Sequence, residues 1–113
     1  MPPTHPLSTI QDRVRIGHYR ITRTAGRTAA MLGFDETDIT SCVLQLTPQD
    51  FYKTMPSKTV PGSAQDVYRT EYLARSVYLK VTLGTPSRPA VIISFKQDDR
   101  SHRRAPWGNG HED

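Results

Sequence analysis

The sequence is short of cysteine and of long hydrophobic runs. A single cysteine, Cys42, excludes an internal disulfide and cannot supply a zinc cluster alone. We expect it to be a small core residue, because it lies in an apolar helical stretch. No window approaches the roughly 18–20 apolar residues of a membrane-spanning helix. The opening residues, MPPTHPLSTI, lack the basic and apolar regions of a secretory signal. The sequence therefore predicts a cytoplasmic protein with no membrane contact.

Most motifs of cofactor and metal chemistry are also missing. The histidines at positions 5, 18, 102 and 111 are far apart, and no pair has the spacing of metal ligands. The chain has no P-loop, no glycine-rich dinucleotide motif and no serine or cysteine nucleophile motif. We therefore predict no metal and no cofactor. An enzyme with these residues has to work with lysine, tyrosine, arginine and glutamine.

The chain does have an excess of positive charge. Fifteen basic residues against 11 acidic ones give a net charge of +4. Such an excess favours an anionic partner, of which nucleic acid is the commonest. The alternative is a basic surface that only aids solubility.

The 113 residues fit one domain, which changes from helical to strand-like patterns along its length. We predict a domain over 1–97 and a disordered, charged tail over 98–113. In LSTIQDRVRIGH, Ser8 as N-cap with Gln11 predicts a helix that ends at Gly17. Further helices are predicted in TRTAGRTAAMLGF, capped by Thr22 or Thr24, in DETDITSCVLQL and, as a short one, in TPQDFYKTM.

After residue 56 the pattern has a period of two. HYRIT earlier in the chain is a short extended candidate, and QDVYRTEYL, SVYLKVTLG and PAVIISFKQ predict three strands joined as hairpins. The class is therefore α+β, with N-terminal helices packed on a C-terminal antiparallel sheet.

One face of this sheet is predicted to be polar. In SVYLKVTL, Val77, Leu79 and Val81 point to the core, whereas Tyr78 and Lys80 point away. In the last strand, the same alternation places Ile92 on the polar face, together with Ser94 and Lys96. The residues expected on the polar face are Gln65, Arg69, Tyr78, Lys80, Ser94 and Lys96, with Tyr52 and Lys53 of the short helix at its rim. Such a face is either ordinary solvated surface or a surface that holds phosphate.

At DFYKTM, QDVYR, VYLKVT and VIISFK the sequence resembles the motility quorum-sensing regulator family of toxins, in order and spacing from Leu7 to Gln97. The resemblance implies a RelE/YoeB-like ribonuclease fold. It also implies an mRNA interferase of a type II toxin–antitoxin system that cleaves mRNA near GC-containing sites. The implied partner is a zinc-containing helix-turn-helix antitoxin, and operator DNA would be bound only through the complex with it.

The resemblance also assigns roles to residues. It implies a catalytic set of Lys53, Gln65, Tyr78 and Lys96, with RNA contacts by Tyr52, Met55 and Arg69 close by. Lys80 belongs less clearly to this set, and we add it as an RNA contact because it lies on the same predicted face. We hypothesise that the RNA 2′-OH attacks the neighbouring phosphate, with the base and the acid left unassigned. The alternative is a non-catalytic module that keeps the toxin fold and binds nucleic acid or protein.

Overall fold

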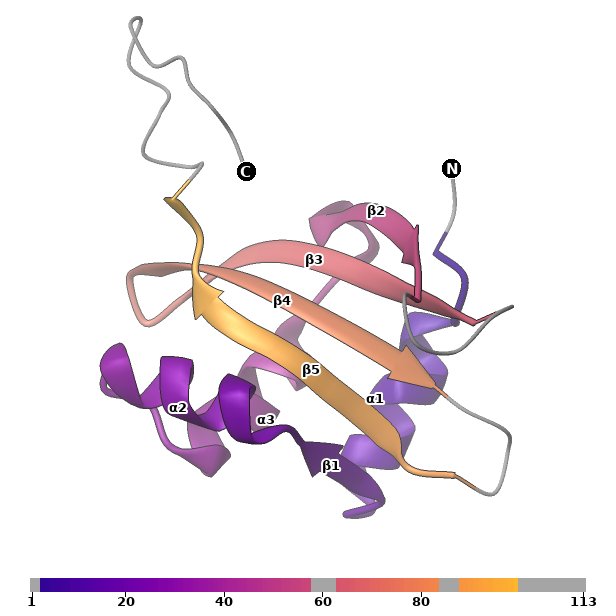
Figure 1. Cartoon of the computed structure of the whole chain (residues 1–113), viewed down its shortest axis with the longest axis horizontal. Coiled ribbons are helices and arrows are strands. Elements are labelled where there is room, and N and C mark those ends of the chain that lie inside the picture. Colours follow the sequence, from indigo (N-terminus) through magenta and orange to yellow (C-terminus); the bar gives the residue numbers. More distant parts are fainter. Residues whose placement is uncertain (1–2, 58–62, 84–87, 100–113) are drawn as a thin grey trace, which may run out of the picture.

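A twisted sheet is the centre of the computed structural model, which describes residues 3–57, 63–83 and 88–99 (Figure 1). The predicted α+β class is confirmed. The helices are α1 (Leu7–Arg15), α2 (Arg23–Met31) and α3 (Glu36–Gln45), and η1 (Pro48–Asp50) is a single 3-10 turn. The strands are β1 (Tyr19–Ile21), β2 (Phe51–Pro56), β3 (Ala64–Tyr72), β4 (Arg75–Leu83) and β5 (Ala90–Gln97). None of these helices is long and apolar enough to cross a membrane.

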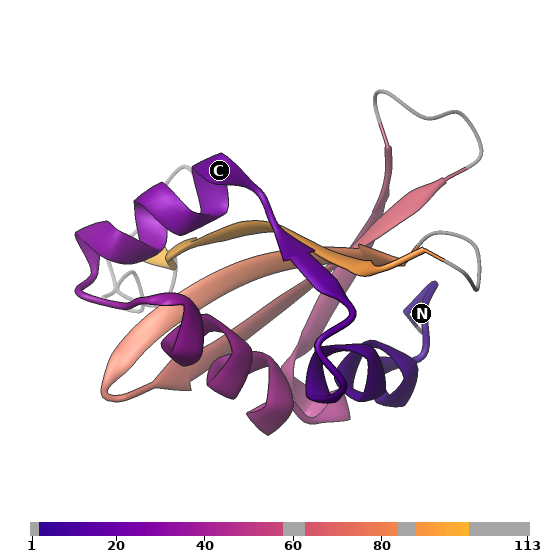
Figure 2. The ribbon, with the colours of Figure 1, turned by 90° about the horizontal axis from the view of Figure 1, so that it is seen from below.

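The strand order is β1-β5-β4-β3-β2. The predicted hairpins β3–β4 and β4–β5 are antiparallel, whereas β1 pairs with β5 in parallel. Helices α1 and α3 lie on one face of the sheet, and α2 runs along its β5 side (Figure 2). Among the described residues, no helix covers the opposite face, which we call the open face.

The starts of α2 and α3 follow the sequence signals. The Thr22 hydroxyl accepts a hydrogen bond from the Ala25 amide, and Asp35 and Asp38 form a reciprocal capping box. The glycine after α1 has a φ of +82°, a conformation that side-chain-bearing residues rarely adopt. These local signals are specific because each satisfies a backbone group that the helix itself leaves unpaired.

The predicted N-cap of α1 is wrong. The helix begins at Leu7, its N-cap is Pro6, and no side chain caps it. Gln11 does not fold back onto its own helix. Its amide nitrogen donates to the carbonyls of Val43 and Leu46, at 3.1 and 3.0 Å. Gln11 therefore caps carbonyls at the C-terminal end of α3, of which that of Val43 also accepts from the Leu46 amide.

The predicted short helix from Thr47 is also wrong beyond its first turn. Thr47 is the N-cap, and its amide and hydroxyl both donate to the Asp50 carboxylate, but only Pro48–Asp50 is helical. Phe51–Pro56 is strand β2, which pairs with β3. In this conformation the backbone of β2 gains the ladder of β3 as its partner, and its aromatic residues suit a strand.

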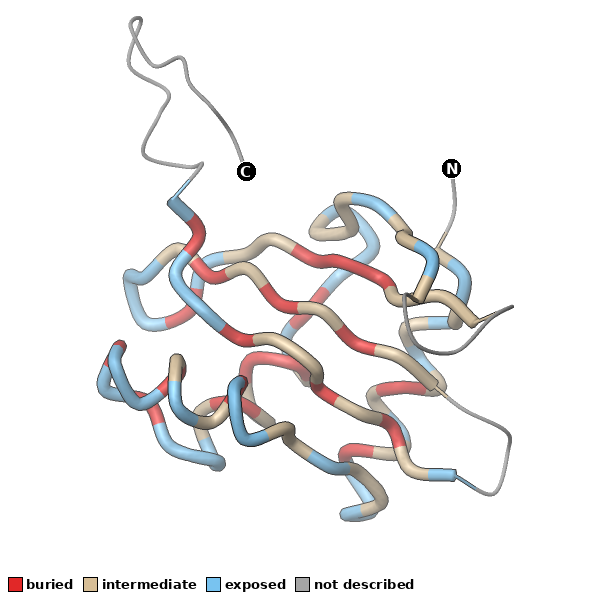
Figure 3. Tube along the Cα trace, in the orientation of Figure 1, coloured by how far each residue is buried: buried red, intermediate tan, exposed pale blue. Residues whose placement is uncertain are grey.

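The core lies between the sheet and the helices. Along β4 the buried residues alternate with half-exposed ones, as Figure 3 shows. Val77, Leu79 and Val81 are fully buried, as predicted. The helices contribute Ile10 and Val43, which are also fully buried. Full burial of an aliphatic side chain stabilises the fold by about 1.5–3 kcal/mol.

Two β-bulges change which residues of β2 and β5 face the core. In β2, Phe51 pairs with Tyr68 and Lys53 with Val67, so Tyr52 is the extra residue. In β5 the register shifts where Lys80 pairs with Ser94 and Val81 with Ile92, so Ile93 is the extra residue. The prediction that Ile92 lies on the polar face is wrong, because the bulge interrupts the alternation and buries this residue completely.

Beyond the end of β1, the outer edge of β5 is covered by two threonines, Thr22 at the N-cap of α2 and Thr28 within α2. The Thr22 hydroxyl donates to the Ile93 carbonyl at 2.8 Å, and the Thr28 hydroxyl donates to the Phe95 carbonyl. These bonds hold the bulged part of β5 and satisfy carbonyls that would otherwise be open to another strand.

The turn between β3 and β4 carries backbone strain that substitution should relieve. Leu73 and Ala74 have φ of 51° and 67°, the signs of a two-residue hairpin turn that favours Asn-Gly. We predict that Leu73→Asn with Ala74→Gly raises the free energy of unfolding by about 0.5–1 kcal/mol, measured in urea. Ala30→Gly in α2 is the control and should cost about 1 kcal/mol. A destabilised double variant would contradict the assignment of this turn.

Candidate active site on the open face

The predicted site residues lie in neighbouring rows across the open face. Arg69, Tyr78 and Lys96 are directly opposite one another on β3, β4 and β5. Side chains opposite each other in an antiparallel pair have Cβ atoms about 4.5–5.5 Å apart. The three groups therefore form one contiguous row. The sequence predicted that they share a face, and the register adds that they are direct neighbours.

A second row lies about 7 Å further along the strands, the rise of two residues. It contains Lys53, Val67, Lys80 and Ser94. Val67 is fully buried although it belongs to the open face. Its neighbours in the row are Lys53, which is exposed, and Lys80, which is half-buried, so the two cations flank one buried apolar side chain. Next to this row, Gln65 pairs with Met55.

All residues predicted for catalysis and RNA contact thus lie on the open face, although their roles stay predictions. Lys53 reaches this face from strand β2, not from the rim of a helix. The bulge at Tyr52 is the cause. It lets Phe51 pack against the core next to Tyr68, with the ring centroids 5.7 Å apart, while Lys53 points to the other side.

Aromatic rings hold the cations of the open face in place. The Lys96 ammonium lies 5.1 Å from the centre of the Tyr78 ring. Tyr52 carries two cations, the Lys53 ammonium at 5.3 Å and the Arg69 guanidinium at 5.0 Å. Each such contact is worth about 0.5–1 kcal/mol at an exposed site. The contacts restrict long side chains, so less conformational entropy is lost when they bind a charged ligand.

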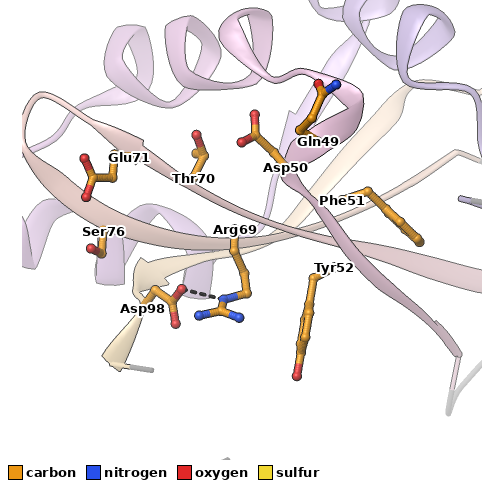
Figure 4. Close-up of a pocket in the computed structure, with 9 residues that line it drawn as sticks. All are labelled: Gln49, Asp50, Phe51, Tyr52, Arg69, Thr70, Glu71, Ser76 and Asp98. Carbon is orange, nitrogen blue, oxygen red and sulfur yellow. Dashed lines mark hydrogen bonds and ion pairs between the residues drawn. The ribbon is translucent and has the colours of Figure 1, made fainter. Parts of the chain in front are cut away.

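A pocket of about 570 Å³ opens at one end of the Arg69 row (Figure 4). It forms where β3 continues past Tyr68, the last β3 residue that pairs with β2. Its lining residues are Gln49, Asp50, Phe51, Tyr52, Arg69, Thr70, Glu71, Ser76 and Asp98. Tyr52 and Arg69 belong to both the pocket and the open face, so one ligand can occupy both.

Asp98 is a residue of this pocket that sequence reasoning missed. It is buried, and its carboxylate contacts the Arg69 Nε atom at 2.7 Å. The sequence assigned it to a disordered tail, because the stretch after β5 has no periodicity. The pairing joins residues far apart in the chain, and no local signal exists for it. The rest of that predicted tail, 100–113, lies outside the described residues.

The described residues offer no alternative catalytic centre of the usual kinds. No group of three or more histidine, cysteine and acidic side chains gathers where it could hold a metal ion within residues 3–57, 63–83 and 88–99. Cys42 is buried in α3, as expected for a core residue. Burial, with a smaller effect of Asp50, raises the pKa of its thiol to about 12, so it is not a nucleophile at neutral pH.

Comparison with known proteins gives the family of this chain. A family model described as motility quorum-sensing regulator, toxin of MqsA, matches residues 2–97. The chain is also similar to the mRNA interferase toxin MqsR of Escherichia coli strain K12. The two are 35% identical over 95 residues, which are 84% of this chain and 94% of the relative. The matched range includes every site residue named above except Asp98.

The raised pKa of Cys42 predicts that its thiol reacts slowly with alkylating reagents in the folded protein. Because the thiolate is the reactive form, we predict that iodoacetamide at pH 8 alkylates the folded protein at least about 100-fold more slowly than the urea-unfolded chain. Ser8→Cys, an exposed position, should add one rapidly alkylated site and serves as the control. Equal rates for the folded and unfolded wild type would show that the thiol is not held protonated and buried.

Proposed function

The chain belongs to the family of motility quorum-sensing regulator toxins, and from this we propose that it is an mRNA interferase with the fold of RelE-like ribonucleases. It would cleave single-stranded mRNA by a metal-independent reaction. The observation that carries this proposal is the register of Arg69, Tyr78 and Lys96, which places two cations and a phenol side by side on a rigid sheet.

The proposed reaction uses a nucleophile that the RNA supplies. The 2′ oxygen attacks the neighbouring phosphorus, the bond from phosphorus to the 5′ oxygen breaks, and the products end in a 2′,3′-cyclic phosphate and a 5′-OH. One proton leaves the 2′ oxygen and one arrives at the 5′ oxygen. Tyr78 and Lys96 are the proposed proton-transfer pair, because they are adjacent at the centre of the face.

The cations stabilise the extra negative charge on phosphorus in the transition state. Lys96 and Arg69 flank Tyr78, and Lys53 stands in the next row. Charges that are already fixed in position stabilise this transition state more than freely reorienting water does, because less solvent has to reorganise during the reaction. Gln65 is proposed to orient phosphate or base by hydrogen bonds.

RNA is proposed to lie along the rows with its bases unpaired. Tyr52 offers a ring that a base can stack on, and Met55 adds apolar contact beside Gln65. Lys80 contacts the backbone as a charge. The preference for GC-containing sites remains a prediction.

A cognate antitoxin is the proposed protein partner, since the family description names an antitoxin for the toxin it describes. We propose that this antitoxin is the zinc-containing helix-turn-helix type, and that operator DNA is bound only through the complex. We propose the cytoplasm as the site of action, because the proposed mRNA substrate and the proposed antitoxin both occur there.

Cleavage of a defined single-stranded RNA by purified protein in EDTA tests the function. We predict fragments ending in 2′,3′-cyclic phosphate, and a 10²–10⁴-fold lower kcat/KM for Lys96→Ala, the usual range for one acid–base or electrostatic group. Arg75→Ala removes the same charge at the exposed start of β4 and should retain wild-type activity.

Intact RNA with a folded wild-type protein would refute cleavage of free RNA. A translation assay then separates a ribosome-dependent nuclease from a binding module, because only the nuclease shortens mRNA during translation. Equal loss of activity in Lys96→Ala and Arg75→Ala would show that general charge, and not the position of Lys96, matters.

Tyr78→Phe separates the hydroxyl from the ring. The ring under Lys96 remains, so we predict unchanged RNA affinity and a single-turnover rate at least about tenfold lower. Affinity is measured with a 2′-fluoro oligonucleotide, which lacks the nucleophile. A wild-type rate for Tyr78→Phe would remove the phenol from proton transfer.

A further inference from the structure

Arg69 is held by an acidic residue, Asp98, which has no role in the reaction proposed above. Its Nε atom lies 2.7 Å from a carboxylate oxygen of Asp98. The Arg69 side chain is 29% exposed, whereas Asp98 is only 4% exposed. A buried carboxylate is costly unless it is paired, so this ion pair has a defined geometry rather than being a loose surface contact.

Asp98 is fixed by its backbone as well as by its side chain. Its amide donates to the Ser76 carbonyl at 2.9 Å, so the residue after β5 is tied across to β4. Arg69 itself is on β3. The ion pair therefore joins three strands, and its position relative to the Arg69 row is set by the sheet.

The Asp98 carboxylate contacts the Arg69 guanidinium at its Nε atom. The Tyr52 ring lies 5.0 Å from the guanidinium carbon. Figure 4 shows the two terminal nitrogens directed into the space between Asp98 and Tyr52 at the pocket. A guanidinium with two such nitrogens can bind two phosphate oxygens at once, which a lysine cannot do.

We propose that Asp98 is a positioning residue of the RNA site. It holds the Arg69 guanidinium by Nε so that the terminal nitrogens bind a phosphate of the RNA strand, and the nucleotide next to the scissile bond occupies the pocket. This inference rests on the proposed function, because it takes a phosphodiester of RNA as the ligand.

The sign of the effect separates positioning from general electrostatics. A carboxylate near a nucleic acid repels it, so removal of that charge alone strengthens binding. Loss of positioning weakens binding instead, because Arg69 then adopts other rotamers. Its guanidinium has to be ordered when RNA binds, which costs conformational entropy. Asp98→Asn keeps the shape of the side chain and removes the charge, so it tests both effects at once.

The experiment compares Asp98→Asn with Asp99→Asn, an exposed neighbour of the same charge. The dissociation constant of a 2′-fluoro RNA oligonucleotide is measured at 50 and 200 mM salt, with cleavage of the matching RNA in parallel. We expect about tenfold weaker binding for Asp98→Asn, the equivalent of one lost charge-assisted hydrogen bond. Asp99→Asn should bind as tightly as wild type or slightly more tightly.

Arg69→Gln, alone and combined with Asp98→Asn, shows whether the effect passes through the arginine. In the Arg69→Gln background we expect Asp98→Asn to cause no further loss of affinity. All variants are compared below their melting temperatures, so that a change in stability does not enter the dissociation constant.

Two results would overturn the inference while leaving the nuclease intact. One is Asp98→Asn binding as tightly as Asp99→Asn. The other is an equal loss from Asp98→Asn with and without Arg69, which would make Asp98 a purely structural residue. A wild-type protein that neither binds nor cleaves RNA would overturn the proposed function, and this inference with it.

Discussion

The bulges in β2 and β5 are the constraint on which the open face depends. Each of these strands has an apolar side chain that points to the core and, two or four residues later, a lysine that points to the open face. In β2 these are Phe51 and Lys53, and in β5 they are Ile92 and Lys96. Strict alternation would place Phe51 and Lys53 on the same side. One extra residue in each strand resolves the conflict, at Tyr52 and at Ile93.

The face that results combines a fixed backbone with restrained side chains. Its cations do not spread over the surface as in a generally basic protein. Lys53, Arg69 and Lys96 pack on the rings of Tyr52 and Tyr78, and Lys53 and Lys80 flank the buried Val67. Both the charge and the aromatic surface are therefore in place before any ligand arrives. The preorganised arrangement lowers the entropic cost of binding a flexible single strand.

Sequence patterns predicted the parts of this structure that depend on near neighbours. The core side of β4, the cap of α2 at Thr22 or Thr24, and the gathering of Arg69, Tyr78 and Lys96 all follow from periods of two or from single turns. The failures came from tertiary partners. The Gln11 side chain donates to a carbonyl at the end of α3 and does not cap its own helix. Residues 51–56 form a strand and not a helix because they pair with β3. The partner of Arg69 lies at Asp98, and no pattern indicates so distant a pair.

The parallel pairing of β1 with β5 has a consequence for synthesis on the ribosome. Within the described residues, Tyr19–Ile21 pairs only with Ala90–Ile92, so the earliest strand has to wait for the latest one. Lys96 and Asp98 also belong to that last segment. A nascent chain therefore lacks the complete sheet and two groups of the open face and its pocket until β5 and the residue after it have been made.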